Sequence, residues 1–410
     1  MKIALLTIGD ELLSGVTVNT NAAWLGNQLM EHGFPVDECV TVGDETSRIR
    51  RSLKYLWESH ELVIVTGGLG PTRDDVTPRA VAEFFHSKLV FHEPTFDSLK
   101  QRLTSRGIEI TEQHKQQSMV PEKAEILAND SGTAPVLHFR QDGRELFCLP
   151  GVPYEMKHLV QSLILPMLEQ KQAVKYVTRL IRTAGVPEST LFHQVEDIIH
   201  HLPDGTVAFL PHIYGVDIRL ILDESAAQKY QLPAVVKDIR ERLGSVVYTD
   251  REETLPAVVG NLLRERELTL ATVESCTGGL LADEITNIPG SSDYFLEGVV
   301  TYSNPSKIQR LGVPEELLRE HGAVSEQVAR AMTEGIRRSS GADTALATTG
   351  IAGPTGGTST KPVGLVFIGY AIGETVNVRR FEFGGDRELN KARAVYAALN
   401  LLRLELKNTD

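Results

Sequence analysis

Short apolar runs alternate with amphipathic segments through the first part of the chain. Residues 2–8 (KIALLTI) have the length and composition of a buried strand, and residues 19–33 have the periodicity of a helix that ends at a glycine. Residues 137–150 predict a hairpin, and an apolar segment over 153–170 predicts a closing helix. Strands and helices that alternate in this way predict a parallel sheet covered by helices.

Residues 175–250 have a different pattern, with two strand-like stretches, one helix over 226–244 and a short final strand. From residue 255 the alternation of strands and helices returns, and it ends in a long helix over 387–406. We therefore expect an α/β protein in which two three-layer α/β/α domains are joined by a small α+β domain. The expected domain boundaries are 1–170, 171–252 and 253–410.

The composition indicates which class of protein, which cellular location and which binding partners to expect. The 410 residues are 41% hydrophobic and 23% charged, which is ordinary for a globular protein, and no apolar run reaches the ~18 residues of a membrane span. Cys39, Cys148 and Cys276 form neither a disulfide framework nor a metal-ligand spacing, so a reducing cytoplasm is the expected location. The formal net charge of −12 argues against a general nucleic-acid binder, because phosphate contacts need clustered Lys and Arg.

Two potential nucleophiles stand side by side in the segment VESCTGGLL, residues 273–281. Ser275 lies where a buried strand is expected to pass into a helix, and helix N-terminal amides can stabilise an oxyanion there. Ser275 or Thr277 could instead only cap the helix. Cys276 is the rival nucleophile, but if Ser275 points into a cleft, its neighbour points elsewhere and packs in the core.

A candidate base and a candidate anion-binding loop follow further along the chain. Lys307, in the segment TYSNPSK, could act as the general base for a serine if it is desolvated, or it could be a solvated surface lysine. His321 is the nearest histidine, so a histidine-based triad stays open. The glycine-rich segment 347–357 (ATTGIAGPTGG) could cradle a phosphate or an oxyanion, or only form a tight turn. Arg387, at the start of the last helix, could hold a phosphate. Together these parts fit acyl transfer on a substrate that carries an amide and a phosphate.

Glycines and acidic residues follow several strands of the first unit. The glycines of TGGLGPTRDDVTP, residues 66–78, allow close backbone approach to a ligand, and Asp74 and Asp75 could bind a divalent cation. Asp44 ends the second strand, and Glu155 follows another. Each acid alone could be a solvated residue or a helix cap, but together at one sheet edge they predict a nucleotide site. The residues assigned to ligand binding are Asp10, Ser14, Asn21, Gly67, Gly68, Gly70, Thr72, Pro150 and Gly151, and those assigned to the metal are Asp74, Asp75 and Glu155.

The motifs ESCTGG, TYSNPSK, TTGIAGPTGG and KPVGLV, in this order, closely resemble the nicotinamide mononucleotide amidohydrolase domain. The resemblance covers residues 255–405. It implies hydrolysis of the nicotinamide carboxamide without a cofactor, with Ser275 as the nucleophile and Tyr302 and Lys307 assisting. Thr349 departs from the pattern, which has a serine before GIAG. The substrate-binding residues assigned here are Glu274, Thr277, Gly278, Asn304, Thr349, Gly350, Ala352, Gly353 and Arg387.

Residues 1–168 resemble the molybdenum-cofactor-biosynthesis fold, whose members bind molybdopterin. Asp44 and Asp75 match the acidic pair of that family and are assigned as catalytic. With a KH-like middle domain that lacks the GxxG loop, the whole chain resembles the CinA family of competence/damage-inducible proteins. In that family the N-terminal domain is associated with metal-dependent ADP-ribose pyrophosphatase activity, so a divalent metal ion is expected in that domain.

The expectation is a cytoplasmic, homodimeric hydrolase of pyridine-nucleotide salvage. Its substrates would be the small molecules nicotinamide mononucleotide and ADP-ribose, without direct contact to nucleic acid or membrane. In one alternative, the N-terminal domain only binds a pterin or a nucleotide and the protein is a competence or recombination accessory. In another, the N-terminal domain processes molybdopterin.

Overall fold

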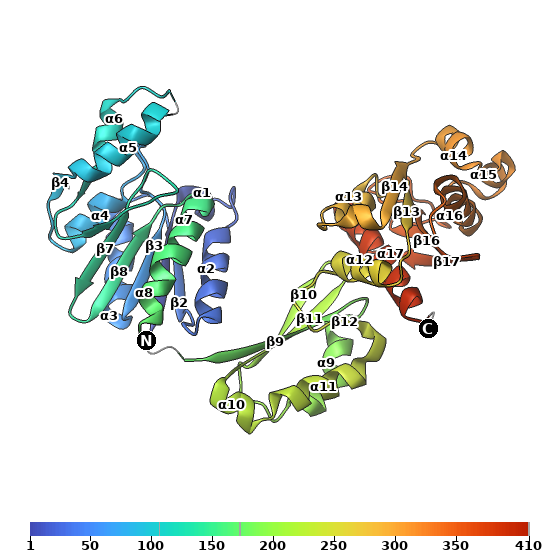
Figure 1. Ribbon diagram of the computed structural model, residues 1–410, viewed down its shortest axis with the longest axis horizontal. Coiled ribbons are helices and arrows are strands. Elements are labelled where there is room, and N and C mark those ends of the chain that lie inside the picture. The colour runs from blue at the N-terminus through green and yellow to red at the C-terminus, as the bar shows by residue number, and fades with distance from the viewer. Residues whose placement is uncertain (106, 172–173, 409–410) are drawn as a thin grey trace. The chain divides into compact units, whose positions relative to one another are not determined.

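The computed structural model describes residues 1–105, 107–171 and 174–408, and it divides into two compact units, Met1–Tyr176 and Val177–Asp410 (Figure 1). Both units contain layered α/β structure, as the alternating pattern predicts. Among the described residues, no helix combines the length and the apolar character that crossing a membrane requires.

The first unit is built on a six-stranded sheet in the order β2-β1-β3-β8-β7-β6. Its strands are β1 (Ile3–Ile8), β2 (Glu38–Val42), β3 (Leu62–Thr66), β6 (Glu125–Leu127), β7 (Val136–Gln141) and β8 (Arg144–Leu149). The four strands from β2 to β8 run parallel, and β7 and β6 add antiparallel pairs. A separate ribbon pairs β4 (Leu89–Phe91) with β5 (Met119–Pro121). The predicted hairpin over 137–150 is confirmed as β7 and β8.

Helices cover both faces of this sheet (Figure 1). Those that pack on the sheet are α2 (Thr20–Glu31), α3 (Thr46–Ser59), α4 (Thr77–Phe84), α7 (Pro153–Leu159) and α8 (Leu165–Glu169). The unit also contains the short α1 (Asp10–Leu13), and α5 (Glu93–Ser105) and α6 (Glu112–Gln116), which lie beyond the end of the sheet (Figure 1). Because successive strand residues point to opposite faces, Leu5 packs with α2, α7 and α8, whereas Leu6 packs with α3 and α4. The three-layer arrangement predicted for this unit is therefore present.

Some elements of the first unit differ from the prediction. The strands β4, β5 and β6 have three residues each and were not expected, because so short a run carries almost no periodic signal. The closing helix is also not a regular α-helix. A π-helical segment, Val160–Ile164, separates α7 from α8 just before Pro166, which cannot donate a backbone hydrogen bond.

The second unit begins with a small α+β domain. Its four-stranded sheet has the order β10-β11-β9-β12, with β9 (Tyr176–Thr183), β10 (Val207–His212), β11 (Gly215–Asp223) and β12 (Val247–Thr249). Its helices are α9 (Glu188–Ile199), α10 (Glu224–Lys229) and α11 (Leu232–Leu243), followed by a 3₁₀ turn over Gly244–Val246. The single helix predicted over 226–244 is wrong. Gln231 has a φ of 50° there, which separates α10 from α11.

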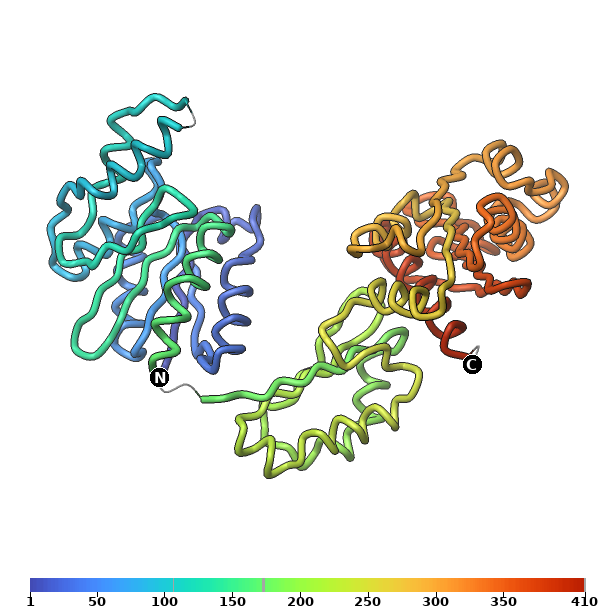
Figure 2. The backbone as a smooth tube through the Cα atoms, viewed as in Figure 1, coloured from blue at the N-terminus to red at the C-terminus, as the bar shows by residue number. Residues whose placement is uncertain are grey.

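The rest of the second unit is a five-stranded sheet in the order β14-β13-β15-β16-β17, covered by helices. The strands are β13 (Leu270–Glu274), β14 (Phe295–Val300), β15 (Thr344–Gly350), β16 (Leu365–Ile372) and β17 (Thr375–Glu382), with a 3₁₀ turn over Ser291–Asp293. The helices are α12 (Leu255–Glu265), α13 (Leu280–Thr286), α14 (Asn304–Leu311), α15 (Glu315–His321), α16 (Glu326–Ser340) and α17 (Arg387–Asn408). The first three strands in sheet order are parallel, and β16 and β17 form the predicted hairpin. Figure 2 shows the long last helix in red beside the yellow α12.

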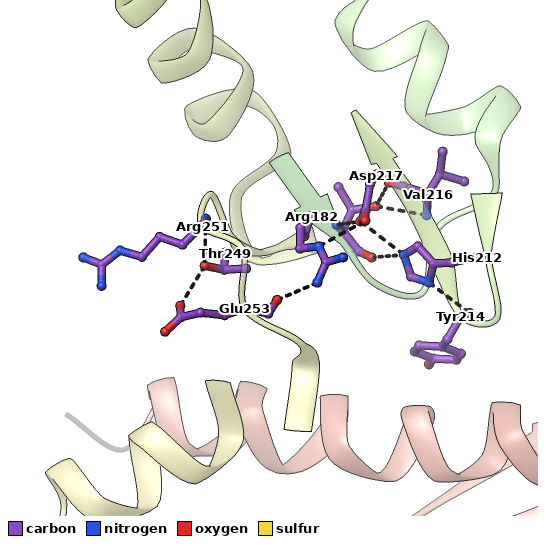
Figure 3. A network of polar contacts seen from close by, with 9 residues as sticks. Arg182, His212, Tyr214, Val216, Asp217, Thr249, Arg251 and Glu253 are labelled. Atoms are coloured by element: carbon purple, nitrogen blue, oxygen red, sulfur yellow. Dashed lines mark hydrogen bonds and ion pairs between the residues drawn. The ribbon is translucent and has the colours of Figure 1, made fainter. Parts of the chain in front are cut away.

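Hydrogen bonds join the α+β domain to the chain that leads into α12. Buried Asp217 accepts from Arg182 Nε at 3.2 Å, and His212 Nε2 lies 3.3 Å from the same carboxylate (Figure 3). The Arg182 side chain also donates to the carbonyl of Glu253, 2.8 Å away. From α17, the fully buried Arg403 donates to the carbonyls of Ser245 and Val247. These contacts explain why the middle domain and the last domain form one compact unit.

Candidate active site

Three consecutive side chains at the end of β13 point alternately to the two faces of the sheet. Glu274 lies on the face covered by α13, whereas Ser275 is directed to α14 on the opposite face. Cys276 is directed again to the core packed by α12 and α17. This alternation follows from strand geometry. It confirms the prediction that the directions of Ser275 and Cys276 differ.

Ser275 is paired with a buried lysine. Lys307 Nζ lies 3.0 Å from Ser275 Oγ and donates to the carbonyl oxygen of Thr301 at 2.7 Å. The lysine side chain is only 1% exposed, and this burial lowers the pKa of Lys307 because it penalises the ammonium form. The α14 helix begins directly after the N-cap Ser303, which places Lys307 one turn inside the helix and against the end of β13. The surface-lysine alternative is therefore wrong, and the described structure places Lys307, not a histidine, against the hydroxyl.

Cys276 has the properties of an inert core thiol. It is 6% exposed and packs among apolar residues of the core. Burial raises the pKa of the Cys276 thiol to about 12. Because the thiolate is the reactive form of cysteine, a thiol that stays protonated at neutral pH is a poor nucleophile. The geometry therefore favours Ser275.

Glu274 caps α13, although the sequence predicted that it contacts substrate. Its side chain is 1% exposed, and its two oxygens accept from the backbone amides of Gly279, Leu281 and Ala282 at 2.9 to 3.0 Å. A buried carboxylate is stable there because the N-terminus of a helix is electropositive and its first amides lack partners. The expected use of these amides for an oxyanion is therefore corrected: Glu274 already occupies them. Its position holds the turn that carries Ser275.

The glycine-rich loop after β15 lies beside Ser275. The Ser275 amide donates to the carbonyl of Thr348 at 2.9 Å, so the loop that starts at Gly350 leaves the sheet next to the serine. Within the part of the chain that the structure describes, the amides of Ala352 and Gly353 donate to no protein acceptor. These amides are the candidates to stabilise an oxyanion in place of those of α13.

The first turn of α17 anchors this loop. Arg387 donates to the carbonyl of Gly353 at 2.8 Å and to the hydroxyl of Tyr302 at 3.2 Å. Buried Asn390 donates to the carbonyl of Ala352 at 3.1 Å. Tyr302 is 62% exposed, so the Tyr302–Arg387 pair stands at the open side of the site. Sequence reasoning missed Asn390, since a lone Asn in a helix gives no signal of a tertiary contact.

Two threonines that the sequence assigned to substrate binding use their hydroxyls inside the protein. Thr277 Oγ1 is buried and lies 2.6 Å from Thr348 Oγ1, and Thr349 is buried and donates to the carbonyl of Ala323 at 2.7 Å. Their assignment to substrate binding is therefore corrected to a structural role, because both hydroxyls are used inside the protein. Gly278, with a φ of 68°, and the exposed Asn304 stay at the surface near the site.

In the first unit, the assigned residues Asp10 and Asp44 meet at the carboxyl ends of β1 and β2. Asp44 accepts from the backbone amide of Asp10 at 2.8 Å. Burial raises the pKa of Asp44, the Asp10 amide lowers it, and the charges of Asp10, Glu11 and Asp74 raise it further. Four carboxylates therefore share one region, beside the point where the strand order reverses between β1 and β3.

The glycines of the first unit bring backbone segments close together. A β-carbon on Gly67, whose φ is 107°, would lie 2.2 Å from the carbonyl oxygen of Ile8, and one on Gly151 would lie 3.3 Å from Gly67 Cα. The Asn21 side chain donates to the carbonyl of Gly151 at 2.7 Å. Only glycine fits at Gly67. The loops after β1, β3 and β8 thus meet at one edge, as predicted. Other assigned residues near this edge are Ser14, Gly68, Gly70 and the buried Pro150. The Ser14 hydroxyl donates to the carbonyl of Glu11.

The carboxylates assigned to a metal ion do not converge. Asp75 accepts from the amide and the hydroxyl of Thr72, and Glu155 accepts from the side chain of Asn129 at 2.8 Å. Over residues 1–105, 107–171 and 174–408, no three His, Cys, Asp or Glu side chains form a group that could hold a metal. Asp74, Asp75 and Glu155 therefore do not fit the expected metal ion as a set, and that ion stays a prediction.

Fold and site together define an α/β protein with a buried serine–lysine pair in its last domain. Family comparisons match three segments: residues 4–170 match a probable molybdopterin binding domain, 178–249 the damage-inducible protein CinA KH domain, and 252–406 the CinA C-terminal domain. A CinA-like protein of Chloroherpeton thalassium is 42% identical over the full length of both chains, and a putative competence-damage inducible protein of Caldicellulosiruptor saccharolyticus is 39% identical, also over both full lengths. The chain belongs to the CinA family.

Solved structures of CinA proteins resemble part of the chain. A CinA superfamily protein from Klebsiella pneumoniae is 37% identical and covers 38% of this chain and 96% of its own, with a TM-score of 0.37. The protein CinA from Thermoplasma acidophilum, described as having unknown function, is 34% identical and covers 40% of this chain and 97% of its own, with a TM-score of 0.38.

Proposed function

We propose that the last domain hydrolyses the carboxamide of nicotinamide mononucleotide to nicotinate mononucleotide and ammonia, with Ser275 as the nucleophile. The observation that carries the proposal is the buried contact between Ser275 Oγ and Lys307 Nζ at 3.0 Å. A serine hydroxyl is a weak nucleophile unless a base lies within hydrogen-bond reach. The choice of this amide rests on the resemblance of the four motifs to the amidohydrolase domain and on the cationic residues beside the serine.

In the first half of the reaction, the neutral Lys307 amine removes the proton of Ser275 while Oγ attacks the carboxamide carbon. The bond that forms is an ester C–O bond, and the carbonyl oxygen becomes an oxyanion. Backbone amides of the 350–357 loop stabilise that charge. The Lys307 ammonium then gives its proton to the amide nitrogen, the C–N bond breaks, and ammonia leaves.

In the second half, water replaces the amine. Lys307, neutral again, takes a proton from the water molecule while the water oxygen attacks the ester carbon. The C–O bond to Ser275 breaks, the proton returns to Oγ, and the carboxylic acid leaves as nicotinate mononucleotide. The carbonyl of Thr301 keeps Lys307 Nζ in place through both halves. Glu274 keeps the turn around Ser275 fixed through its three amide contacts.

The products test this proposal directly. Purified protein is incubated with nicotinamide mononucleotide in water labelled with ¹⁸O, and the nucleotide products are identified by mass spectrometry. We expect nicotinate mononucleotide that carries one ¹⁸O in its carboxylate. Release of free nicotinamide instead would show cleavage of the glycosidic bond, and the proposal would be wrong.

A second candidate function is hydrolysis of ADP-ribose to AMP and ribose 5-phosphate in the first domain. It is favoured by the shared acidic region around Asp44 and by the close backbone approach at Gly67. We expect Asp75→Asn to lose the activity. If the variant keeps its cleavage rate, the assignment of Asp75 is wrong. If ADP-ribose or a pterin raises the midpoint of thermal unfolding without any product, the domain is a binding module instead.

A further inference from the structure

Two cationic side chains of α17 face the loops around Ser275. Arg387 and Lys391 are four residues apart and therefore lie on the same side of the helix. Arg387 contacts the 350–357 loop and Tyr302, as described above. Lys391 lies near the other loop, since a β-carbon placed on Gly278 would lie 3.8 Å from Lys391 Nζ. One helix face thus reaches both loops of the site.

These two cations have no carboxylate partner among the described residues. The hydrogen bonds of Arg387 go to a carbonyl and a phenol, and Lys391 makes none with the protein. The neighbouring carboxylates accept hydrogen bonds from backbone amides or are exposed to solvent. Asp386 accepts from the amide of Leu389 at 2.8 Å and caps α17, Glu274 caps α13, and Glu388 is exposed. Neither cation is therefore held in an ion pair with a carboxylate, in a chain whose formal net charge is −12.

The position of Lys391 suits one part of a mononucleotide. Only two residues separate Ser275 from Gly278, so their Cα atoms lie at most about 10 Å apart. Lys391 Nζ lies near Gly278, at the far end of this short turn. A substrate whose carboxamide is at Ser275 can therefore extend its sugar phosphate to Lys391. Lysine binds phosphate as a strongly hydrated point charge, while the Arg387 guanidinium is fixed beside it.

We propose that Lys391 binds the phosphate monoester of the substrate and thereby selects a mononucleotide over the nucleoside that lacks phosphate. This inference rests on the proposed function of the Ser275 site. It names the substituent that the site recognises, and it assigns a specificity residue outside the four motifs. The alternative is that Lys391 is only a solvated lysine on the surface of α17.

Steady-state kinetics on the 410-residue chain distinguish these two interpretations of Lys391. Nicotinamide mononucleotide is the substrate, and nicotinamide riboside is tested as a competitive inhibitor. Lys391→Gln is expected to raise KM for the mononucleotide by about tenfold or more, to leave the inhibition constant of the riboside unchanged, and to be rescued largely by Lys391→Arg. Lys100→Gln, which removes the same charge from the exposed side of α5 in the first unit, is expected to change neither value. An unchanged KM, or equal weakening of mononucleotide and riboside, overturns the proposal.

Binding decides the inference even if the proposed function fails. If the wild-type protein releases no ammonia, the deamidation proposal is wrong, and the midpoint of thermal unfolding is then measured with saturating mononucleotide. A rise in this midpoint for the wild type and Lys391→Arg, but not for Lys391→Gln, supports phosphate recognition by Lys391. The same rise in Lys391→Gln, or no rise in any of them, overturns it.

Discussion

Lys307 Nζ lies 3.0 Å from Ser275 Oγ, in a place where the lysine side chain is almost completely buried. This contact joins the end of β13 to the helix α14, between two residues that are 32 positions apart in sequence. Burial lowers the pKa of Lys307, so the amine is neutral at a lower pH than that of a free lysine. A neutral amine beside a hydroxyl is the minimum arrangement for an activated serine.

Replacement of the lysine tests its role as a base. Lys307→Met keeps the unbranched side chain up to Cε and removes the amine, and we expect ammonia release to fall by about 10²-fold or more. The fold should not suffer. The pKa of Lys307 is lower in the folded protein than in the unfolded chain, so burying the ammonium form destabilises the folded state. This destabilisation is complete below the folded pKa, and it is lost as pH rises through the pKa of the unfolded chain. The midpoint of thermal unfolding at neutral pH should therefore stay equal or rise, and a clear drop in it would contradict this account.

The pH dependence of the wild type provides an independent measurement. The rate of ammonia release at low substrate should rise with pH as Lys307 loses its proton, and the inflection should lie below the ~10.4 of an ordinary lysine. The sign follows from burial, which disfavours the charged form. A rate that rises only at or above the pH of an ordinary lysine would show that another group is the base.

Glu274 should matter for stability more than for substrate binding. Glu274→Ala leaves three amides of α13 without their acceptor, and we expect the free energy of unfolding in denaturant to fall by about 3 kcal/mol. Glu297→Ala, the same change at an exposed position on β14, is the matched control and should be nearly neutral. Equal effects of the two substitutions would refute the capping role.

The glycine at the edge of the first sheet provides a test of the N-terminal geometry. Gly67→Ala forces a β-carbon toward the Ile8 carbonyl at a φ of 107°, and we expect a loss of about 2 kcal/mol or more in stability of the first unit. Gly26→Ala adds the same methyl group in open space inside α2 and should be neutral or slightly stabilising. The unfolding of both variants is followed by circular dichroism. A Gly67→Ala protein as stable as the wild type would show that the loops do not meet as described.

Much of the fold could be predicted from the sequence because long apolar strands and amphipathic helices carry strong periodic signals. The position of Ser275 at the end of a strand could be predicted in the same way, because the apolar run before it ends close to a glycine pair. The break at Gln231 and the three-residue strands could not be predicted, because tertiary packing decides such short elements. The roles of Glu274 and Thr349 were misread for a related reason. Only the direction of each side chain from its strand shows that both are used inside the protein.

The serine–lysine mechanism is tested most directly by ammonia release from nicotinamide mononucleotide, measured without added metal for the wild type, Ser275→Ala and Cys276→Ala. The account predicts that the wild type and Cys276→Ala release ammonia at similar rates, because the Cys276 thiol is buried in the core. It predicts no release from a folded Ser275→Ala protein. Full turnover by Ser275→Ala, or loss of turnover only in Cys276→Ala, would contradict the central claim.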